Sequence, residues 1–343
     1  MKAIVLEEPN NILFKDIESM NLIDSTSVLV RPRVVGICGT DYHAYKGQQP
    51  FINYPLVIGH ELGVEVLEVG SDVHHLAPGD ACAVEPYIGC KEQDGNLCFS
   101  CRRGHTNHCT RLQVLGVHID GGLCEQFVVP SSKLHRSAKL DYEQLALIET
   151  LAIGYHAVKR SGISKNDVVL VVGAGPIGLS VIQSVNLIGT SVLVLDVNDK
   201  RLQFAKEHFG VNNTYVNPDT IAKEMRSLLS GAMPTIVFDA TGNTKSMESS
   251  FDYVASGGKI ILVGFNRESI VFDDEQFHRN ELSLIASRNA LSDDFTDLIK
   301  LMEDGIIDTS HWISDRANWN SLVKTLPIWC DSTDLIKGVV EIT

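Results

Sequence analysis

The chain has 343 residues, well above the usual size of one domain, so two domains with separate hydrophobic cores are expected. Hydrophobic residues make up 44% and charged residues 21% of the sequence, which excludes a disordered or low-complexity chain. Its 29 basic and 43 acidic residues leave a net charge of −14, so we expect neither nucleic acid nor a membrane as a partner. The N-terminal stretch MKAIVLEEPN lacks the apolar core of a signal peptide, and a cytoplasmic protein is expected.

The first 150 residues contain short apolar runs separated by glycine and proline. Such runs, with turn residues between them, predict the strands of a β-rich, barrel-like domain. The predicted strands are Ile4–Leu6, Val28–Val35, Gly63–Val69, Ala81–Glu85 and Glu125–Val129.

From about residue 145 onward, apolar strands alternate with spacers of helical length. This alternation is the signature of an α/β fold with a doubly wound parallel sheet. A helical pattern over Phe295–Glu303 and a last predicted strand, Gly338–Ile342, follow it. We therefore predict one domain over residues 1–150, completed by 289–343, and a second over 151–288. The six strands predicted for the second domain are Val168–Val172, Val192–Val197, Asn213–Val216, Thr235–Ala240, Lys259–Val263 and Leu282–Ala286.

The first strand of the second domain runs directly into a G-x-G-x-x-G turn. Its glycines permit a tight turn and the close approach of the backbone to a pyrophosphate. The next strand ends near Asp196, at the distance expected for a carboxylate that binds an adenosine ribose and disfavours a 2′-phosphate. Arg201, five residues on, could tolerate that phosphate. The sequence thus predicts an NAD site made by Gly173, Gly175, Pro176, Ile177, Gly178, Asp196, Arg201, Thr241 and Val263.

Four of the eight cysteines fall within twenty residues: Cys90, Cys98, Cys101 and Cys109. In a chain without an export signal, such a cluster indicates metal ligation rather than disulfides. Four thiolates suit a closed, tetrahedral, structural zinc site with no position open for chemistry.

A second set of metal-binding side chains lies in Cys38-Gly-Thr40-Asp41-Tyr-His43 and in Gly59-His60-Glu61. Glu149 stands inside an apolar run just before the second domain, where an unpartnered carboxylate would be costly. Cysteine, histidine and carboxylate ligands leave one position on zinc for water or substrate, as a catalytic zinc requires.

These motifs, in this order, resemble the zinc-containing medium-chain dehydrogenases, and the resemblance covers the whole chain. It implies a GroES-like catalytic domain followed by a Rossmann domain. Glu149 stands where alcohol dehydrogenases of this family place a cysteine, which is similar to the polyol and sugar-acid branch. Further stretches look most similar to bacterial L-galactonate 5-dehydrogenases and their starvation-sensing relatives.

The resemblance implies roles for individual residues. Cys38, His60 and Glu149 would hold the catalytic zinc, and Glu61 would be a ligand or a neighbour that exchanges with one. Asp41 is expected to accept a hydrogen bond from His60 and so to orient its ring.

The remaining family residues concern protons and substrate. Thr40 and His43 match the family's proton relay from substrate to solvent. Arg288 matches a substrate-facing arginine of the polyol dehydrogenases, and its guanidinium would suit the carboxylate of a sugar acid. An interdomain or surface salt bridge is the alternative role for Arg288.

Two features depart from the family pattern. Seven residues, Lys91–Leu97, separate the first two cysteines of the cluster, where the family usually has two. After Gly59-His60-Glu61, Val64 occupies the place of a family glycine, and Gly63 stands just before it. We expect the first departure to reshape a loop and the second to reshape one strand, with the metal ligands retained.

The resemblance implies an NAD- and zinc-dependent dehydrogenase that oxidises a secondary hydroxyl of a sugar acid to a ketone, with L-galactonate as the leading substrate. The alternatives are a polyol or polyol-phosphate dehydrogenase, a catalytically idle NAD-binding regulator and a zinc-free reductase. The family also implies a homodimer or homotetramer, whose seam would be the edge strand Leu282–Ala286 beside Lys259–Gly264.

Overall fold

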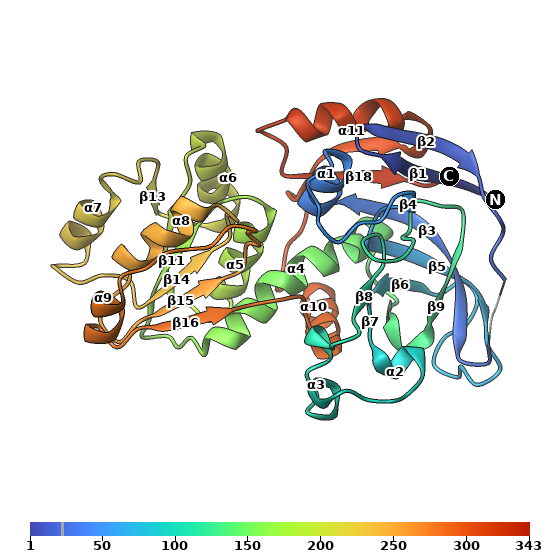
Figure 1. Ribbon diagram of the computed structural model, residues 1–343, viewed down its shortest axis with the longest axis horizontal. Helices are drawn as coiled ribbons and strands as arrows, with labels where there is room; N and C mark the ends of the chain where they lie inside the picture. Colours follow the sequence, from blue (N-terminus) through green and yellow to red (C-terminus); the bar gives the residue numbers. More distant parts are fainter. Residues whose placement is uncertain (22–23) are drawn as a thin grey trace. The chain divides into compact units, whose positions relative to one another are not determined.

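The computed structural model describes residues 1–21 and 24–343, which form two compact units. One unit contains Met1–Glu149 and Leu291–Thr343, and the other contains Thr150–Ala290. Strands and helices are mixed in the chain, and one sheet is entirely parallel, so the predicted α/β class is confirmed (Figure 1). No helix in the described ranges combines the length and apolar character that crossing a lipid bilayer requires.

The first unit is built on a seven-stranded sheet with the order β10-β6-β5-β3-β18-β17, and β9 pairs with β3. Its strands are β3 (Ser27–Ile37), β5 (Glu61–Val69), β6 (Ala81–Val84), β9 (Phe127–Pro130), β10 (Leu134–Ser137), β17 (Ile313–Asn318) and β18 (Lys337–Glu341). Two smaller sheets join β1 (Lys2–Glu8) with β2 (Asn11–Asp16) and β4 (Leu56–Val57), and β7 (Tyr87–Ile88) with β8 (Gln113–Val114).

Three helices of this unit are short: α1 (Gly39–Tyr45), α2 (Cys90–Gln93) and α3 (Phe99–Arg102). The longer ones are α4 (Tyr142–Ser161), which continues into the second unit, α10 (Ser292–Glu303) and α11 (Leu322–Asp331). Strand β18, red in Figure 1, pairs antiparallel with β3, which is blue. The last strand of the chain is therefore part of the sheet that β3 begins.

The second unit holds six parallel strands in the order β13-β12-β11-β14-β15-β16. They are β11 (Val168–Val172), β12 (Ser191–Leu195), β13 (Asn213–Tyr215), β14 (Ile236–Asp239), β15 (Lys259–Leu262) and β16 (Ser283–Ala286). The helices between them are α5 (Pro176–Asn186), α6 (Asp199–Phe209), α7 (Ile221–Leu228), α8 (Thr244–Ser249) and α9 (Asp274–Arg279). The strand order reverses between β11 and β14, which is where doubly wound sheets bind ligands at their carboxyl ends.

The core of this sheet explains why its strands were readable from sequence. Leu170, Leu193, Val237 and Ile260 come from four neighbouring strands and pack in one buried cluster. A parallel sheet covered on both faces needs near-continuous apolar runs, and those runs are what the sequence displays. The largest boundary difference is at β12, which ends at Leu195, whereas Val197, predicted as strand, is 78% exposed.

Candidate active site

Asp41 organises the segment that carries Cys38. Helix α1 begins immediately after Cys38, and the Asp41 carboxylate accepts a hydrogen bond from the Cys38 N–H at 2.9 Å, which caps the first turn. The same carboxylate accepts a bond from the N–H of Gly59 at 3.3 Å. Because Gly59 precedes His60, one buried side chain ties together the two segments that bear the predicted ligands.

Three predicted ligands converge. One ligand atom each from Cys38, His60 and Glu61 lies within 4.8 Å of the others. His60 and Glu61 are buried, and Cys38 is half-buried. A thiol, an imidazole and a carboxylate at such distances form the donor set of a catalytic zinc site.

His60 shows that this cluster suits a cation. Its Nδ1 atom is buried and has no hydrogen-bond partner among the described residues. Burial alone would lower the pKa of His60, but the nearby Asp41 carboxylate and Cys38 thiol raise it well above its ordinary value. The expected hydrogen bond to Asp41 is not formed: Nδ1 lies 3.8 Å from Asp41 Oδ1, because the two backbone N–H groups already orient that carboxylate.

Glu61 has a buried counter-ion that sequence reasoning missed. Lys337, on β18, places its Nζ atom 2.6 Å from Oε1 and 2.8 Å from Oε2 of Glu61. Both residues are almost fully buried, and a buried charge is tolerated only when it is paired. The one signal in the sequence was a lysine inside the apolar run that forms the last strand.

Glu149, the fourth predicted ligand, lies outside the group of three. Its Oε1 atom accepts a hydrogen bond from the Tyr87 hydroxyl at 2.5 Å. Burial raises the pKa of Glu149, although the nearby His60 opposes that rise. Tyr87, which no motif singled out, thus holds a carboxylate beside the cluster.

The four cysteines of the second cluster also converge. Their sulfur atoms lie within 4.8 Å of one another, and backbone N–H groups point at the sulfurs. The N–H of Cys98 is 3.2 Å from Cys90 Sγ, and the N–H of Arg111 is 3.4 Å from Cys109 Sγ. Backbone N–H groups of Cys101 and Thr110 lower the pKa of the Cys98 thiol to about 5. Burial and the neighbouring thiols raise the pKa of Cys101. Four converging sulfurs, with a stabilised thiolate at Cys98, fit a structural zinc site.

The lengthened loop within this cluster folds locally. Cys90–Gln93 forms the helical turn α2, and Glu92 accepts a hydrogen bond from the Gly89 N–H at 3.0 Å. Asp94 pairs with both terminal nitrogens of Arg111, at 2.8 and 2.9 Å. The extra residues therefore close on themselves and return the chain to Cys98 beside its partners.

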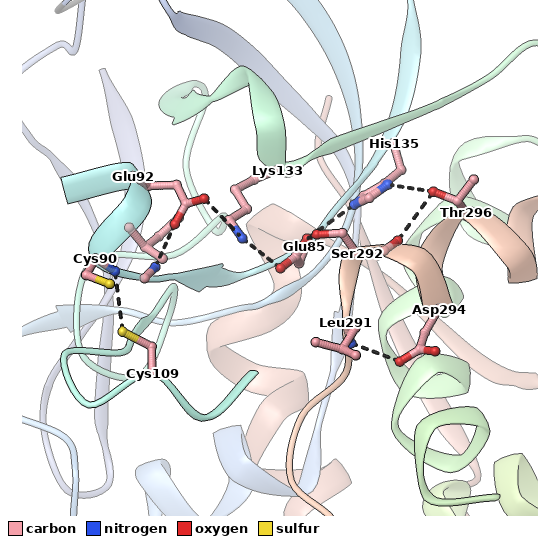
Figure 2. A network of polar contacts seen from close by, with 12 residues as sticks. Glu85, Cys90, Glu92, Cys109, Lys133, His135, Leu291, Ser292, Asp294 and Thr296 are labelled. Atoms are coloured by element: carbon pink, nitrogen blue, oxygen red, sulfur yellow. Dashed lines mark hydrogen bonds and ion pairs between the residues drawn. The ribbon is translucent and has the colours of Figure 1, made fainter. Parts of the chain in front are cut away.

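Figure 2 shows how the four-cysteine loop is tied to the rest of its unit. Lys133 points between two acids, with its Nζ atom 2.7 Å from Glu85 Oε1 and 3.6 Å from Glu92 Oε1. On the other side, Glu85 Oε2 accepts a bond from the Ser292 hydroxyl and lies 3.4 Å from His135 Nε2. This buried network links the cysteine loop to β10 and to the start of α10.

The glycine-rich turn of the second unit has the expected strand–turn–helix setting. Gly173 has a φ of +96°, and α5 begins at Pro176, so Pro176 and Ile177 form its first turn. A Cβ atom on Gly178 would lie 1.7 Å from the Gly173 carbonyl oxygen. The helix therefore packs against the turn at a distance that only glycine allows, as dinucleotide-binding turns require.

Two side chains beside this turn bear on the choice of cofactor. Asp196 accepts one backbone bond on each oxygen, from Ala174 at 2.6 Å and from Asn198 at 2.8 Å. These bonds end β12 and lock the carboxylate against the turn. Arg201 lies near Gly175, and its Nε atom is buried without a partner among the described residues. An unpartnered buried donor beside a glycine turn fits an anionic ligand.

The structure places the other predicted site residues on their elements as follows. Thr241 and Val263 follow β14 and β15, and each donates its backbone N–H to Asp239. Arg288 is exposed in the second unit, two residues beyond β16.

The proposed proton-relay residues share one short helix of the first unit. Thr40 lies in the first turn of α1. His43 is exposed, and its Nδ1 atom is 3.2 Å from Gln48 Oε1.

Comparisons with known proteins agree with this geometry. Residues 24–139 match the alcohol dehydrogenase GroES-like domain, and residues 176–304 match the zinc-binding dehydrogenase family. L-galactonate-5-dehydrogenase of Escherichia coli K12 is 33% identical over 341 residues, which are 99% of this chain and 98% of that protein. The chain therefore belongs to the zinc-type medium-chain alcohol dehydrogenases, and it is a dehydrogenase.

Two solved structures are similar over nearly the whole chain. The rspB alcohol dehydrogenase of E. coli CFT073, in complex with NADH, is 30% identical with a TM-score of 0.91 and covers 100% of this chain and 99% of its own. A zinc-binding dehydrogenase of Sinorhizobium meliloti 1021, bound to NADP, is 26% identical with a TM-score of 0.89 and covers 99% of both chains.

Replacing Gly178 with alanine should destabilise the protein by about 1–3 kcal/mol, because the new Cβ would overlap the Gly173 carbonyl. Gly175→Ala is the matched control, since its Cβ would come no closer than 3.7 Å, to the side chain of Arg201. Thermal unfolding of both variants tests the difference. Equal melting temperatures would contradict the packing argument.

Replacing Lys133 with methionine should cost about 3–5 kcal/mol, because it leaves Glu85 buried without its cation. Lys2→Met removes an exposed ion pair with Asp16 of similar length, 2.6 Å, and should cost no more than about 1 kcal/mol. The measurement is thermal unfolding of the two variants in parallel. A Lys133→Met protein as stable as Lys2→Met would mean that the network in Figure 2 does not anchor the cysteine loop.

Proposed function

We propose that this dehydrogenase oxidises a secondary hydroxyl of a sugar acid to a ketone with NAD as the hydride acceptor, and that L-galactonate is its substrate. The observation that carries the proposal is the convergence of Cys38, His60 and Glu61 in a chain whose second unit has the glycine-rich turn. The similarity to the E. coli L-galactonate-5-dehydrogenase supports the choice of substrate.

The metal centre would be held by Cys38, His60 and one of the two neighbouring carboxylates, Glu61 or Glu149. A zinc ion bound there supplies a Lewis acid that favours loss of the proton from a substrate hydroxyl. The charge balance at this site comes from a residue of the chain. The ammonium group of Lys337 balances the charge of Glu61, so that the cluster keeps its carboxylate beside Cys38 and His60.

The proton that the substrate loses would leave through α1. The Thr40 hydroxyl lies in the first turn of that helix, and His43 is exposed one turn later. A hydroxyl followed by a solvent-facing imidazole can pass a proton outward, because each group both accepts and donates.

The cofactor would bind at the carboxyl end of β11 and β12. Asp196 keeps acceptor capacity on both oxygens after its two backbone bonds, which favours the ribose hydroxyls of NAD and repels a 2′-phosphate. The buried Nε of Arg201 would meet an anionic part of the cofactor. The ratio of kcat/KM with NAD to that with NADP measures whether Asp196 or Arg201 has the larger effect on cofactor choice.

The substrate proposal is tested by NADH formation with purified, zinc-replete protein on a panel of aldonates and neutral polyols. We expect turnover with L-galactonate and weak or no turnover with neutral polyols. Turnover on neutral polyols alone would replace the proposal with a polyol dehydrogenase. No turnover on any of them, with zinc bound, would exclude L-galactonate and leave either a substrate outside the panel or a catalytically idle NAD-binding protein.

Replacing Arg288 with alanine should lower kcat/KM for the aldonate by roughly 10- to 100-fold, because a charged hydrogen bond to the carboxylate is lost. Turnover of any neutral polyol should not change. Arg279→Ala removes another exposed arginine of the same unit, one paired with its helix neighbour Glu275, and serves as the control. Equal effects of the two variants would exclude a carboxylate-binding role for Arg288.

The oligomer proposed from sequence would form along β16. In the described residues this strand pairs with β15 on one side only, and its Leu284 is 36% exposed. An apolar edge strand of this kind favours pairing with the same strand of a second copy.

Replacing Leu284 with lysine should therefore shift the protein toward a smaller species in sedimentation velocity, because a buried lysine opposes edge pairing. Leu187→Lys is the control, since Leu187 is also 36% exposed but lies at the end of α5. An unchanged sedimentation coefficient for Leu284→Lys would rule out this seam.

A further inference from the structure

Two buried carboxylates compete for one place beside Cys38 and His60. A zinc site with an open position needs three protein ligands, and the two residues already supply two. Glu61 and Glu149 are both more than nine-tenths buried. The arrangement of their partners decides which carboxylate reaches the cluster.

The partners hold the two carboxylates differently. Lys337 contacts both oxygens of Glu61, yet Glu61 remains within 4.8 Å of Cys38 and His60. Glu149 does not belong to that group, and its Oε1 atom is bound by the Tyr87 hydroxyl at 2.5 Å. A hydrogen bond to an ionised group is stronger than one between neutral groups. The Tyr87 hydroxyl can therefore decide where the Glu149 carboxylate lies.

Tyr87 is itself held in place on several sides. Its strand β7 pairs with β8, with Tyr87 opposite Val114. Its buried ring packs edge-on against Phe295 of α10, with ring centroids 6.2 Å apart. Two residues earlier, Glu85 is fixed by Lys133 in the network of Figure 2. The hydroxyl is therefore a fixed donor rather than a mobile one.

We propose that Tyr87 is a positioning residue that keeps the Glu149 carboxylate off the metal, so that Glu61 is the carboxylate ligand at rest. This inference rests on the proposed metal centre. Loss of the hydroxyl would leave Glu149 buried without its donor, and coordination to the metal would restore a partner for it. Glu149 would then occupy the position that the substrate hydroxyl needs.

The test uses cobalt in place of zinc and the variant Tyr87→Phe, which keeps the ring on Phe295 and removes only the hydroxyl. Because Glu149 would take the fourth position in place of water, the coordination number stays at four and the exchange of ligand shifts the visible absorption bands of the cobalt. We expect this change in Tyr87→Phe, together with about tenfold tighter metal binding in competition with a chelator. The KM for substrate should rise more than kcat changes, because Glu149 would occupy the metal position that the substrate hydroxyl needs.

The double variant tests whether Tyr87 acts on the metal through Glu149. In a Glu149→Gln background, the Tyr87→Phe change should have no further effect on the cobalt spectrum, because Tyr87 acts only through that carboxylate. Tyr142→Phe is the matched control: it removes another tyrosine hydroxyl from the same helix that carries Glu149, and it should leave spectrum and affinity as in the wild type.

Several results would overturn the inference. The first is a wild-type cobalt spectrum in Tyr87→Phe. The second is a spectral change on Tyr87→Phe that is as large in the Glu149→Gln background as in the wild type. The third is weaker metal binding by Tyr87→Phe than by the wild type. Glu149→Gln alone should keep the wild-type spectrum, so a change there would show that Glu149 is a resting ligand, even if Tyr87→Phe failed to fold. A wild-type protein that binds no metal at Cys38 and His60 would remove the proposed function as well, whereas normal turnover with an unaltered Tyr87→Phe spectrum would remove only this inference.

Discussion

Buried carboxylates constrain the first unit, because a carboxylate taken out of water must find donors or cations inside the fold. Four of them are Asp41, Glu61, Glu85 and Glu149. Their partners, in that order, are two backbone N–H groups, Lys337, Lys133 and the Tyr87 hydroxyl. Each pairing fixes an orientation as well as a charge, so the geometry of both clusters follows from satisfying these acids.

The pairings also tie distant parts of the chain to the site. Lys337 is 276 residues from Glu61, and it arrives only because β18 pairs with β3. Glu85 and Tyr87 lie on one short segment, so the anchor of the cysteine loop and the donor to Glu149 share a backbone. The partners of these carboxylates are therefore in place only when β18 has paired with β3 and when the segment that carries Glu85 and Tyr87 is folded.

Local patterns explain what could be predicted of the fold. The six parallel strands were readable because burial on both faces demands continuous apolar runs, and each observed strand falls within or beside its predicted range. The short strands β2, β4, β7, β8, β10 and β17 were not predicted, because two to six residues with mixed polarity give no periodic signal. Helix α1 was also missed, since its start depends on the Asp41 cap rather than on an apolar face.

The sequence by itself determined the chemical inventory: a cysteine quartet, a Cys38 motif followed by His60 and Glu61, and a glycine turn after a strand. These are local spacings, and local spacing dictates which donor types a loop can present together. Only the tertiary structure decided how the donors are held, giving Lys337 to Glu61, Tyr87 to Glu149 and two backbone N–H groups rather than His60 to Asp41. A buried charge takes whichever partner the packing of distant segments brings within reach, and no spacing along the chain encodes that distance.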